Sequence, residues 1–400
     1  MDRGNVLVIG NSGVGKSTLI NAVLGEEQAE IGWGTKGTTT ELEIHESDKI
    51  PFRIIDTVGF EPTTLKALRA VNAVKKWSKN SIKEGHEDTQ INVIWFCVEG
   101  TSSKLFPKTL RDLSRATSIW SSVPVIVVIT KSYSLPDREQ NIAMVNNAFM
   151  QYKRYGKNLY NVIPVVASPF ILCDTAYAAP EGITELIDAT NVLMPEGLRA
   201  TSKDVAAFKL NRKRVMAHGL VGISTAGAVA IGAAPIPFAD AAVLVPAEIA
   251  MISGLARVYE INSDEDSKLF VESIIKLGTA SAVAKAAIGA ISALKIIPKV
   301  NIGAGAVNAI VAGSIVAALG QTSIYIFEQV YLKNKSVTDI NWINEVIELE
   351  LIDKFPDVVK NIAEKANKDV NWKTLPKTIT DAFRNSSKDD NVNNSTALLN

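Results

Sequence analysis

The sequence feature that most constrains this chain is a glycine-rich stretch near its start, GNSGVGKS at residues 10–17. It fits the pattern G-x-x-x-x-G-K-[ST] without a mismatch. Its glycines let successive backbone N–H groups converge on one anion, and its lysine adds a mobile positive charge. An apolar run rich in β-branched residues precedes the stretch, and a segment with helical spacing follows it. We therefore predict a strand, a phosphate-binding loop and a helix, in that order.

The loop also predicts which residues hold a nucleoside triphosphate. Lys16 is expected to reach the outer phosphates, and Ser17 to offer its hydroxyl to Mg²⁺. The residues expected to bind the phosphates are Asn11, Ser12, Gly13, Val14, Gly15, Lys16, Ser17 and Thr18. The alternative, a plain glycine turn before an ordinary helix, leaves the lysine and the serine unexplained.

A polar, threonine-containing stretch follows the first helix at residues 31–40. A threonine in such a loop can bind Mg²⁺ and the last phosphate, and so hold the loop only while that phosphate is present. We favour Thr39 for this role, with Thr38 and Thr40 as alternatives. The stretch is therefore predicted to be a nucleotide-dependent switch.

The sequence DTVG at residues 56–59 ends the next apolar run. Asp56 at the end of a strand can hold Mg²⁺ through water, and the N–H of Gly59 can bond the γ-phosphate. The following residue is Phe60, which has no hydrogen-bonding atom to orient an attacking water. No catalytic side chain is identified beyond supporting roles for Lys16 and Thr39. We predict slow hydrolysis, completed by a protein partner or by a second copy of the chain.

Apolar runs and helical stretches alternate through the first half of the chain. Six short runs are predicted to be strands: residues 5–9, 41–45, 52–55, 91–98, 123–129 and 162–166. Continuous apolar strands alternating with helices favour an α/β domain, with a mainly parallel six-stranded sheet and helices on both faces. Ligands bind at the carboxyl ends of such strands, where the motifs lie.

The fifth of these runs ends in Thr130 and Lys131, followed after one residue by Tyr133. The first two fit a tolerated variant of the N-K-x-D motif that reads guanine, but Tyr133 stands in the place of the Asp. Ala167 and Ser168 follow the last strand, where a backbone N–H can reach the guanine O6. Thr130, Lys131, Ala167 and Ser168 are therefore predicted to contact the base, while adenine stays open as an alternative to guanine.

Together, GNSGVGKS, the threonine-rich loop, DTVG and VVITKS resemble the Era-like branch of the translation-factor-related GTPases, over roughly residues 1–195. The resemblance implies binding of GTP and Mg²⁺ with slow hydrolysis. It carries these roles onto Lys16, Ser17, Thr39, Asp56, Gly59 and Lys131. Phe60 resembles the family members in which a hydrophobic residue replaces the catalytic Gln, whereas Tyr133 departs from the family pattern.

Beyond residue 197 the composition changes to Ala, Gly, Ile and Val. Four apolar runs follow, and two of them are long enough to span a bilayer. Ala and Gly contribute little transfer free energy but allow close helix packing, so we favour a compact helical bundle over hairpins that enter or lie on a membrane. The segments IPFADAA, PAEIAMI and ARVY within residues 236–259 resemble the YcjF-type domain of unknown function. That likeness implies a bacterial source and a helical effector domain.

We therefore divide the chain into four parts: a nucleotide domain (1–196), an all-α, Ala/Gly-rich domain (197–335), C-terminal helices (336–385) and a disordered tail (386–400). The 42 basic and 42 acidic residues exclude a nucleic-acid-coating chain, and two cysteines disfavour a disulfide scaffold. We expect a cytoplasmic GTPase switch with Mg²⁺, for which association with the inner membrane stays open. The alternatives are a non-catalytic, nucleotide-dependent scaffold or dimerisation module, and an ATPase.

Overall fold

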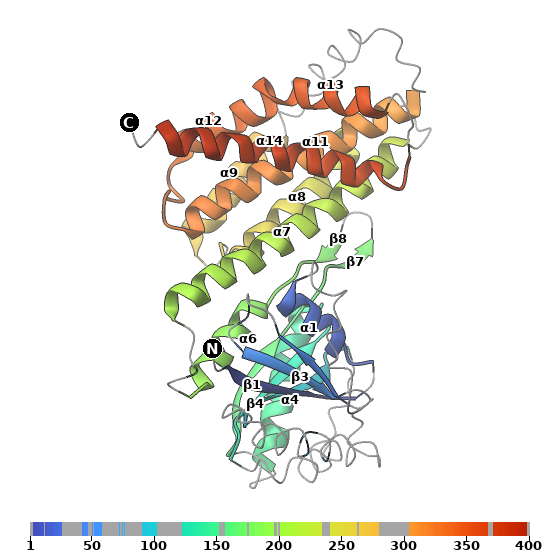
Figure 1. Ribbon diagram of the computed structural model, residues 1–400. Helices are drawn as coiled ribbons and strands as arrows, with labels where there is room; N and C mark the ends of the chain where they lie inside the picture. Colours follow the sequence, from blue (N-terminus) through green and yellow to red (C-terminus); the bar gives the residue numbers. More distant parts are fainter. Residues whose placement is uncertain are drawn as a thin grey trace. The chain divides into compact units, whose positions relative to one another are not determined.

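Figure 1 shows the computed structural model of the chain. The residues that it describes are 3–11, 13–25, 42–46, 50, 52–57, 72, 74, 76, 90–101, 122–151, 157–173, 176–195, 198, 201–233, 241–261, 264–279, 304–366 and 371–397. The chain forms two compact units. The first comprises Met1–Phe170 and Pro180–Val215, and the second Ile171–Ala179 and Met216–Asn400.

The first unit is built on a six-stranded sheet. Its strands are β1 (Gly4–Ile9), β2 (Leu42–His45), β3 (Phe52–Thr57), β4 (Ile91–Glu99), β5 (Val125–Thr130) and β6 (Leu159–Pro164). They lie in the order β2-β3-β1-β4-β5-β6, and every pair is parallel except β2 with β3. The predicted six-stranded, mainly parallel sheet is confirmed.

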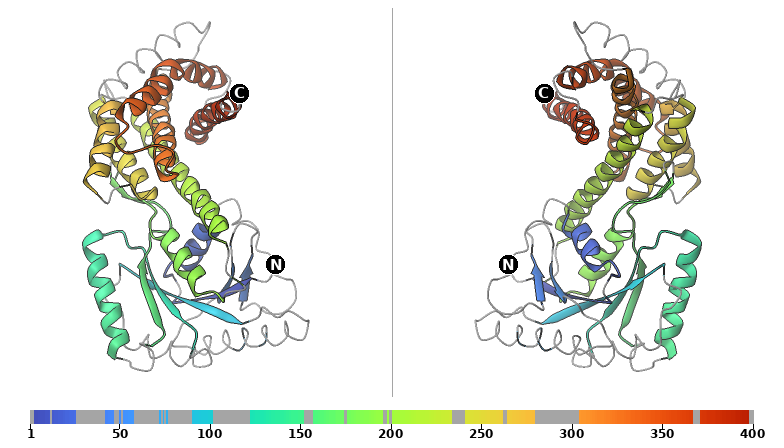
Figure 2. Two further views of the ribbon diagram at one scale, coloured as in Figure 1. Left: turned by 90° about the vertical axis from the view of Figure 1, so that its left-hand side faces the viewer. Right: turned by 90° about the vertical axis from the view of Figure 1, so that its right-hand side faces the viewer.

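The described helices of this unit cover both faces of the sheet (Figure 2). They are α1 (Lys16–Leu24), α4 (Leu135–Gln151) and α6 (Ile183–Leu193). Neighbouring residues of a strand point to opposite faces. Phe96 of β4 accordingly joins the core cluster that contains Phe149 of α4, whereas the indole N–H of Trp95 donates to Thr190 Oγ1 of α6 over 2.9 Å. Because both faces are covered, the central strands β1, β4 and β5 are buried along nearly their whole length.

The second unit is helical apart from a two-stranded sheet of β7 (Phe170–Cys173) and β8 (Ala176–Ala178). Its helices are α7 (Ser202–Ala233), α8 (Ala241–Val258), α9 (Glu265–Thr279), α11 (Ala304–Tyr331), α12 (Ile340–Glu348), a π-helical stretch (Leu349–Asp353), α13 (Phe355–Ala366) and α14 (Leu375–Ala397). Residues 202–215 of α7 belong to the first unit. The predicted all-α second part is confirmed.

Helix α11 is the core helix of this unit and packs against α8, α13 and α14. Glycines bring its backbone close to α7: a Cβ added at Gly320 would lie 2.6 Å from a methyl carbon of Val221, and one at Gly313 would lie 2.5 Å from a methyl carbon of Val229. The Ala- and Gly-rich composition therefore serves close helix packing.

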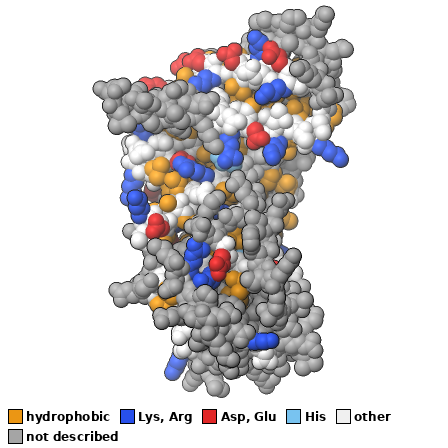
Figure 3. Space-filling model, viewed as in Figure 1, with side chains coloured by type: hydrophobic (Ala, Val, Ile, Leu, Met, Phe, Trp, Pro, Cys, Tyr) orange, Lys and Arg blue, Asp and Glu red, His pale blue; other side chains and the backbone are white. Residues whose placement is uncertain are grey.

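Among the described helices, α7 and α11 are long and apolar enough to cross a membrane. The most apolar window of α7 has a mean hydropathy of 1.6 and is 44% buried. The corresponding window of α11 has a mean hydropathy of 1.7 and is 89% buried. The core helix of a helical bundle is also long and apolar, because other helices cover it on all sides. Figure 3 shows charged side chains of both signs among apolar ones on one face.

The C-terminal tail was predicted to be disordered from residue 386 because it has little apolar content. Among the described residues, α14 continues to Ala397. The stretch after Pro376 contains neither Gly nor Pro, so nothing in it forces a helix that has begun to end. Low hydrophobicity removes a packing partner, yet it does not by itself break a helix.

Candidate functional site

The phosphate-binding loop joins β1 to α1 and lies against the neighbouring strand β4. Gly13 and Gly15 have φ angles of 80° and 95°, a region that residues with a side chain rarely adopt. A Cβ added at Gly10 would lie 2.5 Å from the carbonyl oxygen of Cys97. Gly13 and Gly15 are therefore required by their backbone conformation, and Gly10 by the close approach of the β4 backbone. Ser12 lies outside the described residues.

The Lys16 side chain folds back over this loop. It is only 8% exposed, and its ammonium donates to the carbonyl oxygens of Gly10 and Asn11 over 2.9 and 3.1 Å. An ammonium has three N–H groups, so these two bonds leave one for an incoming anion. The positive charge is thus held in place over the loop that should receive the phosphates.

Lys16 and Asp56 lie near the same point of β4. Asp56 is 6% exposed near the carboxyl end of β3 and is paired in register with Val8 of β1. Burial raises the pKa of the Cys97 thiol to about 12, while the nearby Lys16 charge lowers it and the Asp56 charge raises it by smaller amounts. Both charges therefore act on the same buried thiol of β4.

Comparison with known proteins matches two family models to the chain. Residues 5–131 match a family model described as "50S ribosome-binding GTPase", and residues 200–344 match one described as "Domain of unknown function (DUF697)". The chain joins a P-loop GTPase domain to a DUF697 region. The fusion predicted from the two sequence resemblances is confirmed.

Individual relatives of the GTPase domain are distant. Rab-like protein 3 of Xenopus laevis is 27% identical over 169 residues, 38% of this chain and 70% of that protein. The tRNA modification GTPase MnmE of Porphyromonas gingivalis is 31% identical over 142 residues, 34% of this chain and 27% of that protein. A structure of Era in complex with MgGDPNP and 16S ribosomal RNA aligns at 21% identity over 55% of this chain and 68% of that chain, with a TM-score of 0.32.

Thr130 of the GTPase domain supports the phosphate loop. Its side chain is 2% exposed, and its hydroxyl contacts the carbonyl oxygens of Val14 and, at 3.0 Å, of Val98. A hydroxyl has one hydrogen, so it donates to one of these carbonyls at a time. Thr130 is thus a buried link between the loop and β4, and its contact with the nucleotide stays a prediction.

Lys131 links the same loop to Glu99. Its ammonium donates to Glu99 Oε1 over 2.7 Å and to the Gly13 carbonyl over 2.9 Å, and its φ angle is 53°. The hydrogen bond from Lys131 is the main cause that lowers the pKa of the Glu99 carboxyl. Glu99 was not predicted from the sequence, since a Glu that ends a buried strand belongs to no short motif.

Tyr133 and the end of β6 complete the edge where a base is expected. The Tyr133 ring stacks on Phe170 with centroids 4.1 Å apart and planes 12° apart. Ala167 is half-buried and Ser168 exposed just beyond β6, and the Ser132 N–H donates to the Val165 carbonyl over 3.2 Å. An aromatic pair thus occupies the place in the motif where guanine-reading proteins carry a carboxylate.

The described oxygen donors fit the Mg²⁺ that the family usually uses. Ser17 is exposed in the first turn of α1, and Asp56 offers a carboxylate near the end of β3. Hydroxyl and carboxylate oxygens are the ligands that Mg²⁺ prefers. Thr39, Gly59 and Phe60 lie outside the described residues.

Proposed function

We propose that this chain is a GTP-binding switch that hydrolyses GTP slowly and reports its nucleotide state through the helical unit. The observation that carries the proposal is the buried Lys16 ammonium, which two loop carbonyls hold in place over the loop. A bound nucleoside triphosphate and its metal need a fixed positive charge, a loop whose glycines adopt positive φ angles, and a carboxylate at a neighbouring strand end.

The residues divide the work of binding between them. Backbone N–H groups of the loop from Asn11 to Thr18 would surround the phosphates, and Lys16 would neutralise their outer charge. Mg²⁺, when bound by Ser17, Asp56 and Thr39, would neutralise the remaining phosphate charge. The aliphatic stem of Lys131 would cover the base, with Ala167 and Ser168 at its edge. The Glu99 carboxylate, which pairs with the Lys131 ammonium over 2.7 Å, would hold that side chain in place.

Slow hydrolysis follows from Phe60, which cannot position the attacking water. A partner protein or a second copy of the chain would complete the site. Single-turnover hydrolysis at several protein concentrations measures this directly. A second copy predicts a rate that rises with concentration, and a partner protein predicts a slow rate that does not change. Fast hydrolysis at every concentration contradicts the proposal.

The helical unit is proposed to act as a cytoplasmic bundle that receives the nucleotide signal. The burial of α11 supports the bundle, because a helix already covered by protein has little apolar surface left for lipid. Contact with the inner membrane is the second candidate role of the helical unit. It is supported by the apolar window of α7, of which only 44% is buried. Sedimentation with lipid vesicles, with GTP or a non-hydrolysable analogue, separates the two. Failure to pellet in either state excludes membrane association.

The central test is the Lys16→Ala variant of the full chain, with binding measured by titration of a fluorescent GTP analogue. A charge-assisted contact is worth about 1.5–3 kcal/mol, so affinity should fall by roughly 10- to 100-fold. Lys157→Ala removes an exposed lysine of the same unit and should leave affinity unchanged. Undiminished affinity in Lys16→Ala overturns the proposal, and tighter binding of ATP than GTP in competition would make the chain an ATPase.

A further inference from the structure

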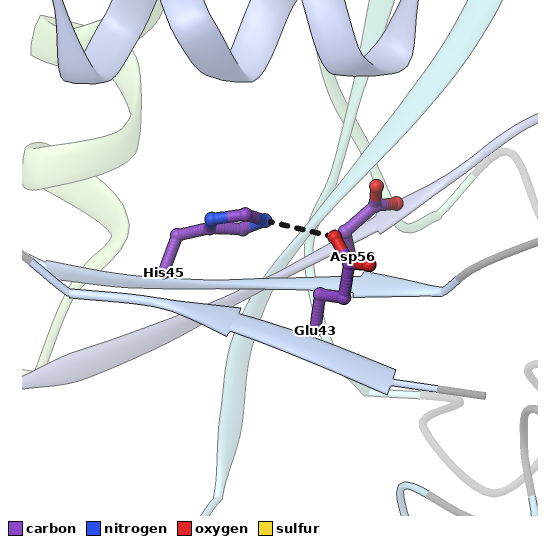
Figure 4. Close-up of side chains that lie close together, drawn as sticks. All are labelled: Glu43, His45 and Asp56. Carbon is purple, nitrogen blue, oxygen red and sulfur yellow. Dashed lines mark ion pairs between the residues drawn. The ribbon is translucent and has the colours of Figure 1, made fainter. Parts of the chain in front are cut away.

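A cluster of metal-ligating side chains lies where β2 pairs with β3 (Figure 4). In this antiparallel pair Glu43 is directly opposite Asp56, and His45 is directly opposite Ile54. Residues two apart on a strand share a face, so Glu43, His45 and Asp56 stand on the same face of the ribbon. The His45 side chain is 18% exposed and that of Glu43 is 59% exposed.

The three side chains are close enough to share one ion. One ligand atom from each lies within 4.8 Å of those of the other two, and His45 Nε2 is 3.8 Å from Glu43 Oε2. Ligands at about 2.0–2.2 Å from a metal are separated from one another by roughly 3–4 Å. Small rotations of exposed Glu43 would therefore bring the set to bonding distance without moving either strand.

The charges of the cluster favour a cation. Two carboxylates directly opposite each other on paired strands repel, and this destabilises the pair. Asp56 is only 6% exposed, so water screens its charge poorly. A divalent ion between the two carboxylates would offset this repulsion.

We propose that Glu43, His45 and Asp56 bind a first-row transition-metal ion, with Zn²⁺ as the tightest-binding redox-inert candidate. One imidazole nitrogen and two carboxylate oxygens suit Zn²⁺, and water or substrate can take the remaining position. Mg²⁺ prefers oxygen ligands throughout, so His45 distinguishes this site from the Mg²⁺ set that contains Ser17.

The proposed metal site has a consequence for the nucleotide cycle. Asp56 belongs both to this cluster and to the residues proposed to hold Mg²⁺. A Zn²⁺ ion on Asp56 should therefore weaken the binding of Mg²⁺ and GTP. This consequence rests on the proposed function, whereas metal binding by the cluster does not.

The test uses the full chain, stripped of metal and free of nucleotide. Zn²⁺ binding is measured by calorimetry, and Co²⁺ binding by its visible absorption, which reports nitrogen and oxygen ligation. We expect one ion per chain, with affinity at least tenfold lower in His45→Gln and in Glu43→Gln. Glu46→Gln is the matched control, because it removes a carboxylate just past β2 that pairs with Arg53. Its affinity should equal that of the unchanged chain.

Two measurements distinguish loss of the metal site from misfolding and from loss of nucleotide binding. His45→Gln should bind Mg²⁺ and GTP normally without Zn²⁺, which shows that the variant is folded. In the unchanged chain Zn²⁺ should reduce GTP affinity, and in His45→Gln this inhibition should be lost. Absence of Co²⁺ or Zn²⁺ binding in the unchanged chain, or equal affinity in His45→Gln, overturns the proposal. Metal binding without inhibition retains the site and contradicts only its link to the nucleotide.

Discussion

The two units are packed in opposite ways. The sheet of the GTPase domain is filled by large side chains such as Trp95 and Phe96, which project to opposite faces of one strand. The helical unit instead brings backbones together at glycines such as Gly313 and Gly320. A core filled by large side chains is sensitive to their loss, because a cavity remains. A core built on glycine is sensitive to addition, because no space exists for another carbon.

The largest expected effect is on the sheet. Phe96→Ala removes a ring that is 1% exposed, so the free energy of unfolding of the GTPase domain should fall by about 3–5 kcal/mol. Hydrogen–deuterium exchange resolved along the chain measures the change in each unit. Phe170→Ala is the control, because Phe170 is 40% exposed and its loss mainly removes the stack on Tyr133. Equal losses in the two variants would contradict the packing described for β4.

The second effect tests a polar group inside the helical unit. Glu248 of α8 is 0% exposed, and neither carboxylate oxygen has a hydrogen-bond partner among the described residues. Burial raises the pKa of this carboxyl from 4.5 to about 7. As pH rises from 4.5 to about 7, the unfolded chain releases the proton first, so stability should fall over this range and then level off.

Glu248→Gln should remove this dependence. Because a pKa unit corresponds to 1.36 kcal/mol, the variant should be more stable by up to ~3 kcal/mol above the range and equally stable below it. Urea unfolding on both sides of the range, followed by helical circular dichroism, measures the difference. Glu265→Gln, an exposed carboxylate of α9, should show no such pH-dependent gain. A constant difference between Glu248→Gln and the unchanged chain at all pH values would refute the burial argument.

The third effect adds one carbon to the helical core. In Gly320→Ala the new Cβ would meet Val221 at 2.6 Å and Met251 Sδ at 3.1 Å. Overpacking of this kind should lower the free energy of unfolding by about 1–3 kcal/mol. Urea unfolding gives the value, and a stabilised variant would show that α7 and α11 pack less closely than described.

The smallest effect has the opposite sign. Gly219 lies in α7, and a Cβ added there meets nothing within 4 Å. Gly219→Ala should therefore stabilise the helix by about 0.5–1 kcal/mol through propensity alone. Thermal unfolding beside Gly320→Ala makes the comparison direct, since both changes are identical in chemistry. If both variants shift the midpoint in the same direction, close packing does not distinguish the two glycines.

Much of the fold could be predicted from sequence because the signals are local. The phosphate loop is specified by residue types at fixed spacing, and the buried strands by continuous apolar runs. The helical character of the second half follows from its Ala content and long apolar runs. The C-terminal tail carries no such local signal: its low apolar content predicts disorder, and α14 continues to Ala397.

By itself, then, the sequence determined that a triphosphate-binding loop opens an α/β domain and that small-residue helices follow it. Only the tertiary structure decided which side chains meet: Lys131 with Glu99, Thr130 with the Val14 carbonyl, and Glu43 with His45 and Asp56. The physical reason is that strand register and side-chain direction depend on partners far along the chain. A shift of one residue in β2 would send Glu43 and His45 to the opposite face, and no local pattern records that choice.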